Sequence, residues 1–219
     1  MATELRYLAV EGPIGVGKST LARALAERLG GELVLEEPHA NPFLERFYRE
    51  PRTAALPTQL TFLLQRSRQA QQLRQADMFA PVRVADFMLD KDRLFARLTL
   101  DDDEYSLYEQ LYERLAMDAP VPDLVIYLQA GPDVLLERIA RRGIACEQRI
   151  ERRYLERLGD AYSRYFHFYD AGALLIINNE RLDVQAREED LQAVLEAIGR
   201  IRHGRHYLNS GQPSLFRSR

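Results

Sequence analysis

A glycine-rich segment near the N-terminus has the spacing of a phosphate-binding loop. Residues 12–19 read GPIGVGKS and match the pattern G-x-x-x-x-G-K-[ST] without a mismatch. Such glycines let backbone N–H groups turn toward phosphate oxygens, at the positive end of the following helix. We therefore expect a bound nucleoside triphosphate, with Lys18 on the β- and γ-phosphates and Ser19 on Mg²⁺. The loop residues expected to contact it are Gly12, Gly15, Val16, Gly17, Lys18, Ser19 and Thr20.

Two carboxylates follow predicted strands at residues 33–35 and 82–85. Glu37 and Asp86 stand at their carboxyl ends, which is where parallel α/β sheets bind ligands. A kinase acting on a hydroxyl needs a carboxylate to accept its proton, and an acid near Mg²⁺. We expect Glu37 in the first role and Asp86 in the second. Glu36 is left out, because side chains alternate along a strand and it would face the opposite side.

Apolar runs alternate with segments of helical periodicity along the chain. Five runs predict strands, at residues 7–10, 33–35, 82–85, 124–128 and 174–177. Periodic segments predict helices after the loop and at residues 56–73, 105–117, 134–142, 154–169 and 189–201. This alternation predicts an α/β P-loop NTPase fold, a five-stranded parallel sheet with helices on both faces. We expect a single domain over residues 1–202 and a polar C-terminal tail over residues 203–219.

Composition limits the classes of partner. The chain has 219 residues, 46% of them hydrophobic, and a formal net charge of -3, which argues against a nucleic-acid or membrane binder. One cysteine, Cys146, fits a reducing cytoplasm. Of 30 basic residues only Lys18 and Lys91 are lysine. A compact ammonium suits a phosphate oxygen in the loop, where a planar guanidinium does not substitute freely.

The order of these motifs resembles the deoxynucleoside kinase family, especially its bacterial deoxyadenosine/deoxyguanosine kinase branch, over about residues 7–183. Glu37-Pro38 looks like the family's Glu-Pro, whose glutamate is the base near the 5′-hydroxyl. Asn41-Pro42 and Tyr48 follow, and the family's tyrosine contacts the sugar 3′-hydroxyl. The resemblance implies a nucleoside-kinase-like fold that uses ATP and Mg²⁺ to phosphorylate the 5′-hydroxyl of deoxyadenosine or deoxyguanosine, or else of deoxycytidine.

The segment QLTFLLQR contributes the expected base-reading residues. Gln59 and Arg66 are seven residues apart, which places both on one face of a helix, with Phe62 between them. A glutamine amide offers both a donor and an acceptor to a base edge. The resemblance implies that Asp92, six residues after Asp86, pairs with Arg66.

Later segments resemble the family's lid and its adenine loop. Arg138 and Arg142 match lid arginines that close over the triphosphate, so the resemblance implies a short arginine-bearing lid over about residues 138–153. Asn179 and Asp183 lie where the family's last loop passes the adenine of ATP. The expected catalytic residues are therefore Glu37, Lys18, Arg138 and Arg142.

Three positions depart from the family pattern. Phe87 stands where an arginine of the family helps to bind the 5′-hydroxyl region. Either Arg93 or a lid arginine replaces it, or the acceptor is held differently. Ile144 replaces another lid arginine, and Arg149 is the expected compensation. Arg153 occupies the place aligned with the lid-side glutamate that binds the 3′-hydroxyl, and Glu151 is the nearest candidate for that role.

Two other functions stay open from the sequence. A nucleoside monophosphate kinase, such as a thymidylate kinase, would need an arginine after the third strand, and both Phe87 and Glu37 argue against it. A regulatory nucleotide-binding protein without kinase activity is supported by the missing arginine and opposed by Lys18 and Asp86. We expect small-molecule partners only, a cytoplasmic location and a homodimer. The resemblance implies that the helix at residues 105–117 packs in the dimer, and the alternative from the sequence is an ordinary core helix.

Overall fold

A computed structural model describes residues 5–74, 81–116 and 119–209. Met117, at the expected end of one helix, and residues 210–219 of the expected tail lie outside the described residues. The chain forms one sheet of parallel strands in the order β2-β3-β1-β4-β5-β6. The strands are β1 (Tyr7–Glu11), β2 (Glu32–Val34), β3 (Arg83–Ala85), β4 (Leu124–Gln129), β5 (Ala173–Asn178) and β6 (Arg205–Asn209).

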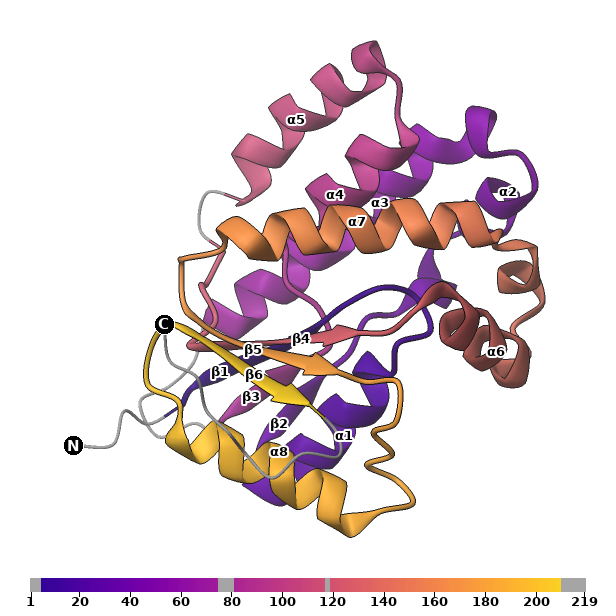
Figure 1. Cartoon of the computed structure of the whole chain (residues 1–219). Coiled ribbons are helices and arrows are strands. Elements are labelled where there is room, and N and C mark those ends of the chain that lie inside the picture. Colours follow the sequence, from indigo (N-terminus) through magenta and orange to yellow (C-terminus); the bar gives the residue numbers. More distant parts are fainter. Residues whose placement is uncertain (1–4, 75–80, 117–118, 210–219) are drawn as a thin grey trace.

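Helices cover both faces of the sheet (Figure 1). On one face lie α1 and α8, and on the other lie α3 and α7, with α4 and α5 packed outside them. The helices are α1 (Lys18–Leu29), α2 (Leu44–Arg49), α3 (Pro51–Arg74), α4 (Lys91–Thr99), α5 (Asp102–Ala116), α6 (Pro132–Arg142), α7 (Arg152–Phe168) and α8 (Glu188–Arg200), with short 3₁₀ turns η1 (Pro38–Ala40) and η2 (Ala145–Arg149). The α/β fold with helices on both faces is confirmed.

The side chains of β1 show how one strand builds two cores. Leu8 and Val10 pack with Leu25 of α1 in the core on one face of the sheet. Tyr7 and Ala9 point to the other face and pack with residues of α7, including Tyr162. Successive side chains of a strand alternate, so a strand buried on both faces is apolar throughout. This double burial fixes the end of β1, where the glycine-rich loop begins.

The expected number of strands was wrong, because a sixth strand lies within the segment that we expected to be a polar tail. Residues of β6 pair in parallel with β5, from Leu174 opposite Arg205 to Asn178 opposite Asn209. β6 lies at the edge of the sheet and none of its side chains is buried. Backbone hydrogen bonds hold such a strand without an apolar pattern, so periodicity does not reveal it.

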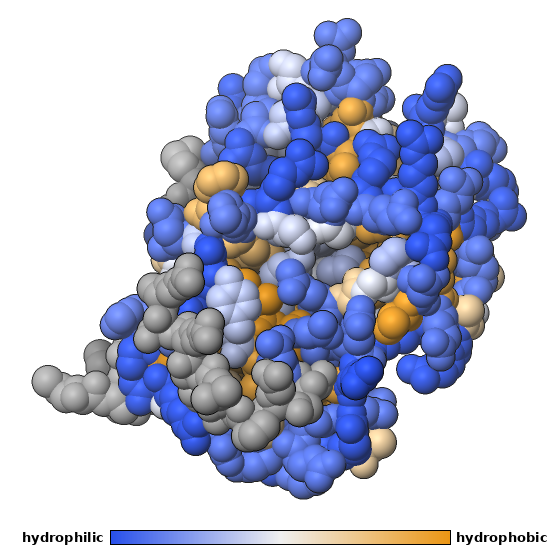
Figure 2. Space-filling model, in the orientation of Figure 1, coloured by the Kyte–Doolittle hydropathy of each residue, from blue (hydrophilic) through white to orange (hydrophobic). Residues whose placement is uncertain are grey.

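The surface on the side seen in Figure 2 is mainly hydrophilic, with small hydrophobic areas between the polar side chains. Within the described residues, no helix combines the length and apolar character needed to cross a membrane. Both observations agree with the charged composition of the chain.

Candidate active site

The glycine-rich loop joins β1 to α1 and has the backbone geometry that its sequence predicts. Gly12 has φ 146°, and a Cβ there would lie 2.5 Å from the carbonyl oxygen of Leu128. Gly17 precedes α1 in a left-handed conformation. Lys18 is the first residue of α1, and its Nζ donates to the carbonyl oxygens of Gly12 at 2.9 Å and Pro13 at 3.2 Å. The loop therefore surrounds a half-buried ammonium at the positive end of a helix, which is an anion-binding arrangement.

One pocket, which we call the outer pocket, lies over this loop. Arg138 forms part of its wall and donates to the carbonyl oxygens of Asn179 at 2.7 Å and Val16 at 3.3 Å. Most of the residues expected to contact the triphosphate line it. Its lining comprises Gly15, Val16, Gly17, Lys18, Ser19, Thr20, Leu21, Arg138, Arg141, Arg142, Asn179, Leu182, Asp183, Val184, Gln185 and Ala186. Gly12 lies beneath the loop instead, against β4.

A second pocket, the inner pocket, lies between the loop and α3. It is lined by Ile14, Gly15, Lys18, Ser19, Glu36, Pro38, Leu44, Phe47, Tyr48, Thr58, Gln59, Phe62, Arg66, Asp86, Lys91, Phe95, Arg142, Glu147 and Tyr154. The two pockets share Gly15, Lys18, Ser19 and Arg142. Two ligands bound in these pockets would therefore meet at the ammonium of Lys18. That arrangement suits the transfer of a phosphoryl group from one ligand to the other.

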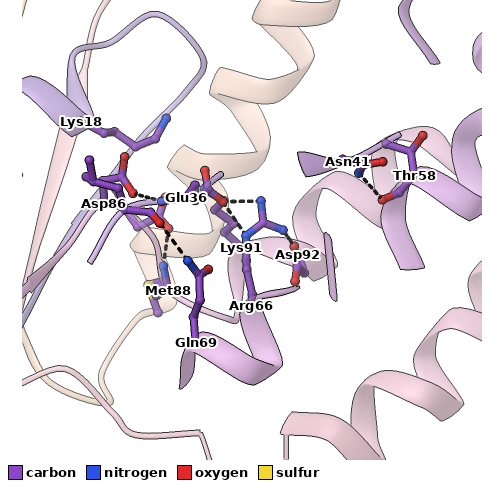
Figure 3. Close-up of polar contacts among 12 residues, drawn as sticks. Lys18, Glu36, Asn41, Thr58, Arg66, Gln69, Asp86, Met88, Lys91 and Asp92 are labelled. Carbon is purple, nitrogen blue, oxygen red and sulfur yellow. Dashed lines mark hydrogen bonds and ion pairs between the residues drawn. The ribbon is translucent and has the colours of Figure 1, made fainter. Parts of the chain in front are cut away.

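Glu36, which we had left out, lines the inner pocket, whereas Glu37 is exposed and lines neither pocket. The expectation that Glu37 faces the site was therefore wrong. β2 ends at Val34, so strand alternation does not continue to these residues. Instead, Glu36 N–H donates to Asp86 Oδ1 at 2.8 Å, and Gln69 Nε2 donates to the carbonyl oxygen of Leu35 at 2.8 Å (Figure 3). These bonds turn the side chain of Glu36 into the pocket.

The carboxylate of Glu36 is surrounded by cations. Arg66 Nε donates to its Oε1 at 2.5 Å, and Lys91 Nζ lies 2.7 Å from its Oε2 (Figure 3). Burial alone would raise the pKa of Glu36, but the charges of Arg66, Lys91 and Lys18 outweigh it and lower that pKa to about 2. Glu36 is therefore ionised at neutral pH and able to accept a hydrogen bond from a hydroxyl.

Arg66 connects Glu36 to Asp92, whose side chain is completely buried. The guanidinium also lies over the ring of Phe62, 4.8 Å from its centroid. Gln59 lies one turn of α3 before Phe62, and its Nε2 donates to Thr99 Oγ1 at 3.2 Å. The structure thus brings the four expected base-reading residues to one end of the inner pocket, with Asp92 behind Arg66 rather than in the lining.

The lid side of the pocket differs from expectation. Tyr48 lines the inner pocket as expected, but Glu151 is exposed at the start of α7 and lines neither pocket. Glu147 of η2 is buried, lines the inner pocket and pairs with Arg142. Burial raises the pKa of Tyr48, and the nearby charge of Glu147 raises it further, so Tyr48 stays a neutral hydroxyl. The expected compensation by Arg149 was also wrong, because Arg149 is exposed and lines neither pocket.

Ser19 and Asp86 provide oxygen atoms at the junction of the two pockets. Ser19 Oγ donates to Asp86 Oδ2 at 2.5 Å. Across the described ranges, no group of three or more His, Cys, Asp or Glu side chains is placed to hold a metal ion. Mg²⁺ usually takes only one or two protein oxygens and completes its shell with phosphate oxygens and water. A hydroxyl and a carboxylate beside a phosphate-binding loop fit that preference.

Glu11 is a buried carboxylate that the sequence reading missed. Its oxygens accept hydrogen bonds from Gly12 N–H at 3.1 Å, Met88 N–H at 2.7 Å and the Tyr162 hydroxyl at 3.0 Å. Burial raises its pKa, against the charges of Lys91 and Lys18. Glu11 therefore ties the start of the glycine-rich loop to the segment after β3. A polar residue ending an apolar strand was the available signal.

The parallel sheet, the loop and two pockets that meet at Lys18 define a P-loop phosphotransferase. The chain belongs to the deoxynucleoside kinase family, whose profile, described as deoxynucleoside kinase, matches residues 8–202. It is therefore an enzyme that phosphorylates deoxynucleosides, and both the resemblance and the kinase class are confirmed.

Named relatives support the same family. A deoxyguanosine kinase of Bacillus subtilis is 36% identical over 160 residues, covering 71% of this chain and 76% of that protein. A deoxyadenosine/deoxycytidine kinase of Bacillus subtilis is 30% identical over 204 residues, covering 90% of this chain and 93% of that protein. The solved structure of a deoxyadenosine kinase from M. mycoides with dCMP and dCDP has a TM-score of 0.78 at 25% identity, covering 89% of this chain and 100% of that one.

Proposed function

We propose that this enzyme transfers the γ-phosphate of ATP to the 5′-hydroxyl of a purine deoxynucleoside. The observation that carries the proposal is the place of Glu36, an ionised carboxylate in the inner pocket beside Lys18. In this proposal ATP binds in the outer pocket and the nucleoside in the inner one. Glu36 accepts the proton of the 5′-hydroxyl as that oxygen attacks the γ-phosphorus.

Cations on the ATP side of the site stabilise the negative charge that develops on the phosphate oxygens during the transfer. Lys18 contacts the β- and γ-phosphates, and Arg138 and Arg142 close over them, so that all three stabilise the transferred group. Arg142 lines both pockets, which supports this role. The adenine lies against the loop that contains Asn179 and Asp183.

Recognition of the nucleoside is divided between two ends of the inner pocket. Gln59 and Arg66 contact the base edge, Phe62 contacts its face, and Asp92 holds Arg66 in place. Tyr48 and Glu147 bind the sugar 3′-hydroxyl, a role in which Glu147 replaces our expectation for Glu151. A purine is favoured because curated relatives over most of the chain are named deoxyguanosine kinase, deoxyadenosine kinase and deoxyadenosine/deoxycytidine kinase.

A transfer assay tests the proposal. Radiolabelled ATP is offered with each of the four common deoxynucleosides and, in parallel, with each 5′-monophosphate. We expect label on deoxyadenosine or deoxyguanosine in preference to thymidine, and none on the monophosphates. A preference for thymidine or deoxycytidine, or transfer only to monophosphates, would contradict it.

Neither alternative function is favoured. A monophosphate acceptor would place a second phosphate against the carboxylate of Glu36, which repels it. A regulatory protein would not need the general base that the site provides, and the curated relatives are named as kinases.

We also propose that Mg²⁺ binds at Ser19 Oγ and Asp86, where the bound ion would neutralise charge on the phosphate oxygens. The Asp86→Asn change keeps the size of the side chain and removes its charge. We expect the Mg²⁺ concentration that gives half-maximal rate to rise about 10- to 100-fold, because a weaker ligand remains. Mn²⁺ binding to the ADP complex, measured by electron paramagnetic resonance, checks the metal directly. Asp90→Asn is the control, since Asp90 lines neither pocket.

The proposal extends to assembly and location. Leu64 of α3 and Leu107 of α5 are each 48% exposed, on two helices that pack together, which supports a homodimer through this side. Tyr108 and Tyr112 of α5 are buried within the protomer and do not belong to this surface. Sedimentation velocity measures the oligomeric state.

The single free cysteine supports a reducing cytoplasmic location.

A further inference from the structure

Both lysines of the chain line the inner pocket. Lys18 belongs to the phosphate-binding loop, whereas Lys91 comes from α4, on the opposite side of Glu36. All other basic residues among the 30 are arginines, so a bias toward arginine in the composition has left two lysines in one pocket. Because arginine serves as well as lysine in an ordinary ion pair, the retained ammonium at position 91 indicates a specific contact.

The position of Lys91 is unfavourable for the fold itself. Its side chain is only 3% exposed, and it is the first residue of α4. A cation at a helix N-terminus faces the positive end of the helix dipole. Lys18 and Lys91 both line the inner pocket, and Glu36 lies between them (Figure 3). Glu36 carries a single negative charge and also pairs with Arg66, so a second anion bound near the two ammonium groups would be stabilised.

The proposed reaction creates such an anion. Transfer to a nucleoside leaves a phosphate on the 5′-oxygen, next to the ionised Glu36, and the two negative charges repel. Lys18 serves the departing nucleotide, so the acceptor side needs a cation of its own. Four cations line the inner pocket: Lys18, Arg66, Lys91 and Arg142.

Two of the other cations each pair with a carboxylate other than Glu36. Arg66 is held between Glu36 and Asp92 at the base-reading end, and Arg142 pairs with Glu147 in the lid. Arg93, which we had expected to replace the arginine missing at Phe87, pairs with Glu109 and lies over the ring of Tyr112. Arg93 lines neither pocket, which contradicts that part of the expectation, whereas the lid arginine Arg142 does line the inner pocket. Phe87 itself is 1% exposed and packs in the core between the sheet and α7.

We propose that Lys91 is the acceptor-side cation of this enzyme: its ammonium contacts the 5′-oxygen and the phosphoryl group as it arrives, while it holds Glu36 in position. This role rests on the proposed function. It makes Lys91 a catalytic residue, and it assigns to α4 a part in the chemistry that the sequence pattern alone does not indicate. The alternative is that Lys91 only balances buried charge.

The test compares Lys91→Met, which keeps an unbranched side chain without charge, with Lys91→Arg and with the control Arg93→Met. Steady-state kinetics and calorimetric binding of the 5′-monophosphate product are measured for each. We expect Lys91→Met to lower kcat about 100- to 1000-fold, to weaken product binding at least about 10-fold and to leave the nucleoside KM within about threefold. Arg93→Met should stay within about twofold of wild type.

Lys91→Arg keeps the charge and therefore the ion pair with Glu36. We expect its melting temperature to equal that of wild type and its kcat to fall about 10-fold, because the longer planar group displaces its charge from the 5′-oxygen. A folded Lys91→Met enzyme with kcat within threefold of wild type would overturn the proposal. If Lys91→Met does not fold, wild-type kcat and product affinity in Lys91→Arg would overturn it. The wild-type control tests the proposed function separately. If wild-type enzyme phosphorylates no deoxynucleoside, the proposed function fails; if wild-type enzyme is active and Lys91→Met is equally active, only the role of Lys91 fails.

Discussion

Glu36→Gln should lower kcat by roughly 10²- to 10⁴-fold, the range typical of a lost general base. Glutamine has the size of glutamate and retains an oxygen that can accept a hydrogen bond, but it cannot take up a proton. ATP affinity should stay within about threefold of wild type, because Glu36 lines the inner pocket and not the outer one. Steady-state kinetics with the preferred deoxynucleoside and calorimetric titration with a non-hydrolysable ATP analogue check both parts.

The neighbouring glutamate is a matched control. Glu37→Gln makes the same chemical change one residue later, at an exposed side chain that lines neither pocket. We expect its kcat to stay within about twofold of wild type, as for most surface substitutions. A large loss in Glu37→Gln together with near-normal turnover in Glu36→Gln would show that the base was assigned to the wrong residue.

The two glutamates also show where sequence reasoning stops. The glycine-rich loop was predictable because its geometry depends on local residues, namely glycines at fixed offsets and a following helix. The choice between Glu36 and Glu37 depends on Asp86 and Gln69, which are distant in sequence and hydrogen-bond the backbone after β2. Strand alternation predicts the wrong residue wherever a strand ends a residue or two earlier than its apolar run.

Two other residues of the site could not be predicted from the sequence, because their position depends on tertiary packing. Lys91 and Glu147 reach the inner pocket only because α4 and η2 pack beside it, and neither belongs to a local pattern. The one signal for Lys91 was compositional, since lysine is so rare in this chain. The resemblance to a family placed Gln59, Arg66 and Asp92 together more successfully than periodicity could, because it carries information about tertiary contacts.

Asp92→Asn should both destabilise the fold and change the choice of nucleoside. Asp92 is 0% exposed and Arg66 is its ion-pair partner. Removing one charge of a buried pair leaves the other uncompensated, and such changes cost about 3–5 kcal/mol of unfolding free energy. Among the described residues, Glu36 is then the carboxylate that still pairs with Arg66, and Glu36 is shared with Lys91. We therefore expect a loss of about 3 kcal/mol in chemical denaturation.

The control for this change is Asp90→Asn, two residues earlier. Asp90 is partly exposed, and its Oδ1 accepts a hydrogen bond of 3.4 Å from the hydroxyl of Tyr112. We therefore expect Asp90→Asn to lower the free energy of unfolding by less than about 1 kcal/mol. A second comparison uses the pair Arg66→Met with Asp92→Asn. Replacing both charges of a buried pair costs less than removing one of them, so the double variant should be more stable than Asp92→Asn alone. A double variant whose loss equals the sum of the two single losses would indicate that the residues act independently.

Substrate choice separates recognition from stability. Without its ion pair to Asp92, the guanidinium of Arg66 is no longer held in a fixed position. A site rejects the wrong base strongly when that base leaves buried polar groups of the site unpaired, and this requires those groups to be fixed. We expect the ratio of kcat/KM between the preferred and the next purine deoxynucleoside to fall about 10-fold or more in Asp92→Asn, while the KM for ATP changes less than threefold. Measurement well below the melting temperature of the variant removes the effect of unfolding. An unchanged ranking in a destabilised Asp92→Asn enzyme would mean that the buried pair supports the fold and that Gln59 reads the base without it.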